Sequence, residues 1–156
     1  MKILITGGKT VTALKLIKAF EGAEILLGDY GDMPNINTNS STFVGLGEWN
    51  ATILAHNLLT KCLDNGVDIL LPIYEAEIAA LSKSLVLFDE FGLKVLLPEN
   101  SQPSLTKFKD WCVFDKGTII YTSTNSNVEA DNSLNGAYSF DAKTGELALI
   151  SIANPL

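Results

Sequence analysis

The hydrophobic positions of this chain form short continuous runs that alternate with helical stripes. The first run covers residues 2–6 and ends at Gly7 and Gly8. A run that is apolar on both faces predicts a strand of a parallel sheet that helices cover on both sides. Similar runs predict further strands at residues 23–28, 42–44, 67–71 and 93–97.

Apolar residues at the spacing of one helical face lie between these strands. The i, i+3, i+4, i+7 spacing predicts a first helix that carries Ala13, Leu16, Ile17 and Phe20 and stops at Gly22. Further helices are predicted at residues 50–65, 75–91 and 105–112. This alternation of strand and helix predicts an α/β fold, with a Rossmann-like parallel sheet and helices on both of its faces.

The pattern changes after Phe114. Residues 118–124 are rich in β-branched side chains, and two short runs at 137–141 and 146–152 flank Ala-Lys-Thr-Gly, which is a strong hairpin signal. We expect these strands to extend the edge of the sheet or to form a small flap. The predicted organisation is a Rossmann-like domain at residues 1–114 and a C-terminal antiparallel β-hairpin extension at residues 115–156, packed on the same domain.

Composition and charge exclude several classes of partner. The chain has 156 residues, of which 47% are hydrophobic and 19% charged, so it is long enough to bury a core as one domain. Its formal net charge of −7 argues against nucleic acid or an anionic membrane, because both need a basic face. No apolar stretch approaches the roughly 18–20 residues of a membrane span. Without a recognisable signal peptide, we expect a cytoplasmic protein.

The turn after the first strand, Thr-Gly-Gly-Lys-Thr at residues 6–10, is a candidate anion site. Its glycines would let backbone N–H groups approach a phosphate at the start of the first helix. The third glycine of a dinucleotide-binding turn is absent, and the phosphate-loop motif would need glycine at Ile3. The turn is therefore either a weak anion site or a structural turn. Asp29 ends the second strand about 20 residues later, where an acidic side chain either binds a ribose hydroxyl or belongs to an ordinary loop.

No catalytic constellation is recognisable. His56 is the only histidine, which disfavours a Ser-His-Asp site and a multi-histidine metal site. Cys62 and Cys112 lie on predicted helices without a cationic neighbour that would activate a thiolate. No tyrosine has a lysine four positions later, as the acid/base pair of a short-chain dehydrogenase requires. We therefore predict no catalytic and no metal-binding residue, and the cofactor stays unknown.

Four segments resemble, in their order, the N-terminal pre-ATP-grasp domain of carbamoyl-phosphate-synthase-like ATP-grasp proteins. They are residues 2–8, 28–29, 65–72 and 92–98. In that Rossmann-like domain the fourth strand runs into a proline and then into acidic residues that open a helix, as Pro72, Glu75 and Glu77 do here. The resemblance covers about residues 1–111, and the ATP-grasp portion with its nucleotide-binding lysines and metal-binding acidic residues has no counterpart in this sequence.

Three functions remain open. The first is a stand-alone pre-ATP-grasp-like module, without ligase activity of its own, that binds a small molecule or assists a separate ATP-grasp protein. The second is an enzyme or sensor that binds NAD(P) or an adenine nucleotide, and the third is a structural homo-oligomer without a ligand. Apolar residues beside the stripe of the third helix and on the final strand also predict a homodimer. The expected ligand site comprises Gly7, Gly8, Lys9, Thr10, Asp29, Tyr74, Glu75 and Glu77.

Overall fold

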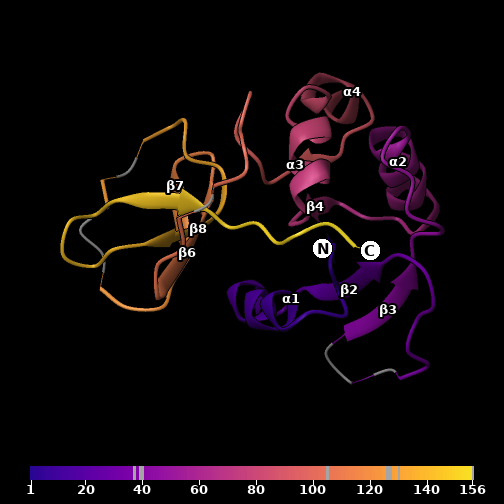
Figure 1. Ribbon diagram of the computed structural model, residues 1–156, viewed down its shortest axis with the longest axis horizontal. Coiled ribbons are helices and arrows are strands. Elements are labelled where there is room, and N and C mark those ends of the chain that lie inside the picture. The colour runs from indigo at the N-terminus through magenta and orange to yellow at the C-terminus, as the bar shows by residue number, and fades with distance from the viewer. Residues whose placement is uncertain (37, 39–40, 105, 126–127, 130, 156) are drawn as a thin grey trace.

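Five parallel strands form the central sheet of the computed structural model, which describes residues 1–155 except 37, 39–40, 105, 126–127 and 130. The strands are β1 (Lys2–Ile5), β2 (Glu24–Asp29), β3 (Ser41–Gly45), β4 (Ile69–Leu71) and β5 (Lys94–Val95). Their order across the sheet is β3-β2-β1-β4-β5, with parallel pairing throughout. Figure 1 shows β2 and β3 side by side. The apolar runs of the sequence therefore correspond to strands of a parallel sheet.

Helices cover both faces of this sheet. Leu4, Leu26 and Leu70 belong to one buried cluster, which also holds residues of α2 (Leu54–Asp64), α3 (Glu75–Leu81) and α4 (Leu85–Glu90). Ile3, Ile5 and Ile25 belong to a second cluster, together with α1 (Val11–Leu16) and the 3-10 helix η1 (Ile17–Phe20). Neighbouring residues of one strand thus alternate between the two clusters, as the pleat of a strand requires.

Two predicted helices differ from the expectation in length. The helix predicted at 75–91 is divided into α3 and α4, and hydroxyls near the break donate to helix carbonyls: Ser82 to Ala79 O, Ser84 to Ala80 O. Such local side-chain bonds compete with the helical backbone bonds. The helix predicted at 50–65 begins only at Leu54, after a turn in which Asn50 Oδ1 accepts bonds from the Thr52 amide and hydroxyl.

The helix predicted at 105–112 is wrong for its described residues. Residues 110–112 belong to β6 (Asp110–Asp115), so Cys112 lies on a strand. β6 is an inner strand, and its four central residues, Trp111 to Phe114, are all buried. A short run that is apolar on both sides has no period that separates a buried helix from a buried strand.

β6 belongs to a second, antiparallel sheet. The other strands are β7 (Thr118–Thr122), β8 (Gly136–Phe140) and β9 (Leu147–Leu149), in the order β7-β6-β8-β9. The hairpin predicted from the terminal sequence is confirmed as the pair β8 and β9. However, it does not extend the parallel sheet, because its strands pair with β6 instead. The expected boundary between residues 114 and 115 falls at the end of β6, inside the second sheet.

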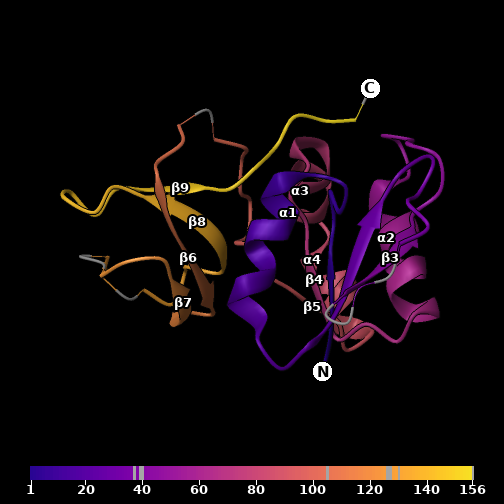
Figure 2. The same cartoon turned by 90° about the horizontal axis from the view of Figure 1, so that it is seen from below.

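The two sheets lie on either side of α1 (Figure 2). Ala13 and Leu16 share a buried cluster with Trp111, Val113 and Ala137 of the second sheet. The Lys15 amine also lies 5.5 Å from the centre of the Trp111 ring, which is within the range of a cation–π contact. The helix that covers one face of the parallel sheet therefore presents its other side to the antiparallel sheet.

A second junction lies at β5, the edge strand of the parallel sheet. The Asn135 side-chain amide donates to the carbonyls of Val95 and Leu97, each at 3.2 Å. Gly136 follows with φ +117°, and a Cβ there would lie 2.8 Å from the Leu96 carbonyl oxygen. The connection into β8 thus occupies carbonyls that an uncovered sheet edge would leave unpaired.

Among the described residues, no helix is long and apolar enough to cross a membrane.

Candidate functional site

The residues singled out from the sequence gather at the carboxyl ends of three adjacent strands. Gly7 and Gly8 follow β1, Asp29 ends β2, and Tyr74 and Glu77 follow β4. The chain leaves β1 for β2 on one side of the sheet and later enters β4 on the other side. The loops after β1 and β4 therefore diverge to opposite sides at this edge, which is the usual place of ligands in open α/β sheets.

The glycine turn is shaped by close packing against β2. Gly8 donates a backbone hydrogen bond to Gly28 O at 2.9 Å, and a Cβ on Gly8 would lie 2.7 Å from the carbonyl carbon of Leu27. Gly7 has φ +64°, a conformation that side chains rarely adopt. Thr10 closes the turn, because its hydroxyl donates to Gly7 O at 2.6 Å and accepts from the Ala13 amide at 3.3 Å. Packing against β2 and these hydrogen bonds therefore explain the residues of the turn without a bound anion.

Lys9 joins this turn to the loop after β2. Its amide donates to Asp29 Oδ2 at 3.0 Å, and its amine donates to the carbonyls of Tyr30 and Asp32 at 2.8 and 3.0 Å. The amine therefore already has two acceptors within the chain. An anion bound by Lys9 would compete with these carbonyls.

Asp29 is buried, with 1% of its surface exposed, and it accepts three hydrogen bonds. The donors are the Lys9 amide, the Tyr30 amide at 2.8 Å and the Tyr74 hydroxyl at 2.7 Å. A buried carboxylate needs such donors, because the loss of water is otherwise very costly. A ribose hydroxyl would therefore have to displace one of these donors or reach the remaining acceptor position of an almost fully buried carboxylate.

Glu77 is a second buried carboxylate, placed on the first turn of α3. The Thr6 hydroxyl and the Tyr74 amide donate to its Oε1 at 2.5 and 3.2 Å, and the Tyr30 hydroxyl donates to its Oε2 at 2.6 Å. Burial raises the pKa of Glu77 to about 7; the hydrogen bonds from these three donors oppose the rise, and the Asp29 charge adds to it. Burial therefore favours the protonated form of Glu77 more than is usual for a glutamate.

Aromatic rings cover the two carboxylates. Trp49 lies edge-on to Tyr30 and Tyr74, with ring centres 4.8 and 5.7 Å apart respectively. Burial, together with the hydrogen bonds to the neighbouring carboxylates, raises the pKa of both tyrosines above the ordinary value. Both phenols therefore stay protonated and act as hydrogen-bond donors at neutral pH. We call Thr6, Asp29, Tyr30, Tyr74 and Glu77 the carboxylate cluster.

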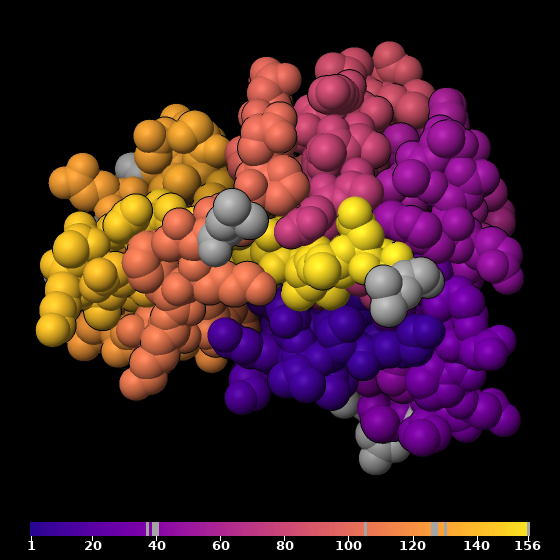
Figure 3. Space-filling view, viewed as in Figure 1, coloured from indigo at the N-terminus to yellow at the C-terminus, as the bar shows by residue number. Residues whose placement is uncertain are grey.

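A segment from the far end of the chain lies across the same edge. Ile152 donates its amide to Ile73 O at 2.8 Å, and its carbonyl accepts the Glu75 amide at 3.0 Å. The Asn154 side-chain oxygen accepts the Ala76 amide at 2.8 Å. Glu75, one of the predicted site residues, thus contacts this segment through its backbone amide. We call residues 150–154 the strap (Figure 3, yellow, between the indigo N-terminal segment and α3).

Sequence reasoning missed Tyr30, Trp49 and the strap. Tyr30 follows Asp29 directly, so a tyrosine beside a strand-end acid was the available signal. Trp49 and the strap belong to segments that carry no recognisable motif, and they come near the cluster only in the folded chain. His56 is exposed on α2. Burial raises the pKa of each cysteine thiol to about 12, so neither forms a thiolate readily.

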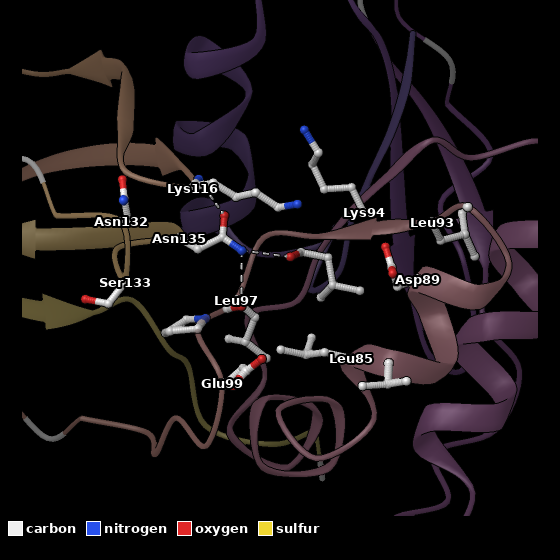
Figure 4. A pocket seen from close by; sticks show the side chains of 14 residues that line it. Leu85, Asp89, Leu93, Lys94, Leu97, Glu99, Lys116, Asn132, Ser133 and Asn135 are labelled. Carbon is white, nitrogen blue, oxygen red and sulfur yellow. Dashed lines mark hydrogen bonds between the residues drawn. The ribbon is translucent and has the colours of Figure 1, made fainter.

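Two surface cavities lie away from this cluster. The larger, about 870 Å³, lies between α4, the β5 edge and the connection into β8, with Leu93, Lys94 and Lys116 in its wall (Figure 4). The smaller, about 680 Å³, lies between η1 and β3. Within the part of the chain that the structure describes, no three His, Cys, Asp or Glu side chains come together as a metal site.

No protein-family model matches this sequence, and no curated protein matches it closely enough to count as a relative.

Proposed function

We propose that this chain is a small-molecule-binding module whose ligand binds at the carboxyl edge of β1, β2 and β4, beside the carboxylate cluster. The cluster is the observation that carries the proposal. Asp29 and Glu77 are both almost completely buried and are held by two tyrosine hydroxyls from opposite loops. Buried ionisable groups are expensive, and they concentrate where a protein binds or transforms a ligand.

The sheet supports the same location. The order β3-β2-β1-β4-β5 is that of Rossmann-like domains, in which ligands bind where the strand order reverses. Here this point lies between β1 and β4, where Gly7 faces Ile73. From the resemblance to pre-ATP-grasp domains we propose further that the chain is an accessory module of the cytoplasm, which assists a separate ATP-grasp protein and has no ligase activity of its own.

The nucleotide-binding alternative has less support. Its two expected contacts are an acidic residue on a ribose hydroxyl and backbone amides on a phosphate. Asp29 already accepts three hydrogen bonds, one of them from the Lys9 amide of the glycine turn. The hydrogen bond from the Lys9 amide to Asp29 therefore occupies both groups that a nucleotide would need, the acidic side chain and a backbone amide of the candidate phosphate turn. The third alternative, a structural protein without a ligand, would give the two carboxylates a purely structural role, in which their hydrogen bonds to Tyr30 and Tyr74 hold the edge of the sheet together.

A thermal-shift screen tests the proposal. Amino acids, ATP and NAD(P) are added in turn, because a ligand that binds only the folded state raises its apparent stability. We expect a hit whose affinity falls at least about tenfold in Tyr74→Phe. Tyr121→Phe is the matched control, since Tyr121 lies on β7 of the other sheet. A ligand that binds Asp29→Asn and Tyr74→Phe as tightly as it binds the unchanged chain would show that the site lies elsewhere. The cavity beside Lys116 would then become the first candidate.

A further inference from the structure

The strap changes sheets within two residues. Ile150 donates its amide to Ala137 O at 2.9 Å, as part of the antiparallel sheet. Ile152 then exchanges two backbone hydrogen bonds with the loop after β4, on either side of Tyr74, in a parallel bridge. The strap therefore behaves, at Ile152, as an added strand of the kind that extended peptides form on exposed backbone.

The strap also fills a side-chain site. A Cβ on Gly7 would lie 2.7 Å from Ile73 Cδ1 and 3.0 Å from Ile152 Cδ1, so the Ile152 side chain rests where glycine leaves room. Ile152 packs against both buried clusters of the parallel sheet. Two residues later the Asn154 oxygen accepts the Ala76 amide. Gly7 and residues 73–76 thus bind the strap through its backbone, one apolar side chain and one side-chain oxygen.

We propose that this groove, formed by Gly7 and residues 73–76, is a recognition site for an extended peptide-like ligand, and that the strap is an internal occupant which the ligand displaces. The inference rests on the proposed function and names its ligand class. The ligand would carry a branched apolar side chain in the place of Ile152, with an amide or carboxylate oxygen two residues later. Its backbone would take over the hydrogen bonds to Ile73 O and the Glu75 amide.

The Tyr74 side chain links this groove to the carboxylate cluster. Its backbone lies between the two bonds to Ile152, while its hydroxyl binds Asp29 and its amide binds Glu77. A ligand that replaces the strap therefore contacts the segment that holds both carboxylates. Occupation of the groove and the state of the cluster are coupled through this one residue.

The test compares the full chain with a weakened-strap variant, Ile152→Ala combined with Asn154→Ala. The probe is a synthetic peptide with the sequence of residues 149–155, Leu-Ile-Ser-Ile-Ala-Asn-Pro. A tethered segment competes at an effective concentration in the millimolar range, so the unchanged chain should bind the peptide at least about tenfold more weakly than the variant does. In amide NMR spectra of the variant, the peptide should shift the signals of Gly7, Ile73 and Glu75. A control peptide that carries aspartate at the position of Ile152 should shift none of them.

Hydrogen exchange checks that the variant has an open groove. The Glu75 amide should exchange at least about tenfold faster in the variant, while the amides of β1 keep their protection. If the double variant does not fold, Asn154→Ala alone removes one exposed hydrogen bond and should give the same changes in smaller measure. Equal binding of both peptides, or no binding to a variant with an exposed Glu75 amide, would overturn the inference. A small molecule that binds the unchanged chain and the variant equally would overturn it too, yet leave the proposed function intact.

Discussion

The Tyr74 hydroxyl donates a 2.7 Å hydrogen bond to Asp29 Oδ1, across 45 residues of sequence. The Tyr30 hydroxyl makes the reciprocal bond to Glu77 Oε2 at 2.6 Å, across 47 residues. Asp29 and Tyr30 come from the end of β2, whereas Tyr74 and Glu77 come from the loop and helix after β4. Each of two neighbouring segments thus gives a phenol to the carboxylate of the other, and these crossed bonds hold the carboxyl edge of the sheet together.

Tyr74→Phe and Tyr30→Phe should each lower the free energy of unfolding by about 1–3 kcal/mol, because each leaves a buried carboxylate without one donor. The double variant should depart from additivity, since Asp29 and Glu77 are neighbours in one network. Denaturant titration of the four proteins measures both effects. Tyr121→Phe, outside the network, should change the free energy by less than about 0.5 kcal/mol. Losses of that small size for Tyr30 and Tyr74 as well would show that the crossed bonds contribute nothing to stability.

Stability should fall as pH rises from 4.5 to about 7, because Glu77 has an ordinary pKa of 4.5 and a raised pKa of about 7 in the fold. In this interval the folded state keeps the Glu77 proton and the unfolded chain loses it. The stability that protonated Glu77 contributes is therefore complete below pH 4.5 and lost above about pH 7. The expected loss is on the order of 3 kcal/mol. Denaturant titrations across this range measure the slope. Glu77→Gln should flatten it and Glu75→Gln should not; an unchanged slope in Glu77→Gln would assign the titration to another group.

Gly8 and Gly22 have different reasons to be glycine, so Gly22 serves as the control for Gly8. Gly8→Ala should destabilise the fold by several times the roughly 1 kcal/mol of a backbone-strain effect, since its Cβ would meet β2 backbone at 2.7 Å. Gly22→Ala isolates the strain alone, because Gly22 has φ +83° and nothing lies within 4 Å of its added Cβ. Thermal unfolding of both variants compares them. Equal losses would mean that β2 shifts easily to make room.

Asn135→Ala should loosen the second sheet from β5. The variant loses the bonds to the Val95 and Leu97 carbonyls and the acceptor of the Lys116 amide, for an expected loss of about 1–3 kcal/mol. Hydrogen exchange should also rise in β8 more than in β1. Asn132→Ala, an exposed residue of the same connection, is the control. Unchanged exchange in β8 would show that the other contacts between the sheets, which are those of α1, the strap and the Lys94–Asp115 ion pair, hold them together without Asn135.

A homodimer remains a prediction, and its surface is now narrower. The prediction rests on Val86 and Leu87 of the third predicted helix and on Ala148, Ile150 and Ile152 of the final strand. Ala148 is buried, and Leu87, Ile150 and Ile152 pack within their own chain, which leaves Val86 on α4 as the most exposed of the five, at 72%. Light scattering at tens of micromolar should detect a dimer that Val86→Lys weakens. Val11→Lys is the control, because Val11 is 81% exposed on α1. A monomer in the unchanged protein would contradict the prediction.

The sequence predicted the parallel sheet well, because β1, β2 and β4 are buried on both faces and therefore form unbroken apolar runs. The same property misled at β6, where Trp-Cys-Val-Phe is compatible with a buried helix and with a buried strand. Asp29 and Glu77 could be placed near one edge from the strand order alone. Tyr74 was also placed there, but its bond to Asp29 and the bond of Tyr30 to Glu77 could not be predicted, since each joins residues more than 40 positions apart.

The strap has a consequence for the order of events during synthesis. The Glu75 amide obtains its acceptor only from Ile152, which the ribosome adds after the whole second sheet has been made. At about 5–20 residues per second, several seconds separate the synthesis of Glu75 from that of Ile152. In a newly made chain, the carboxyl edge of the parallel sheet therefore obtains its contacts with Ile152 and Asn154 after every strand of both sheets has been synthesised.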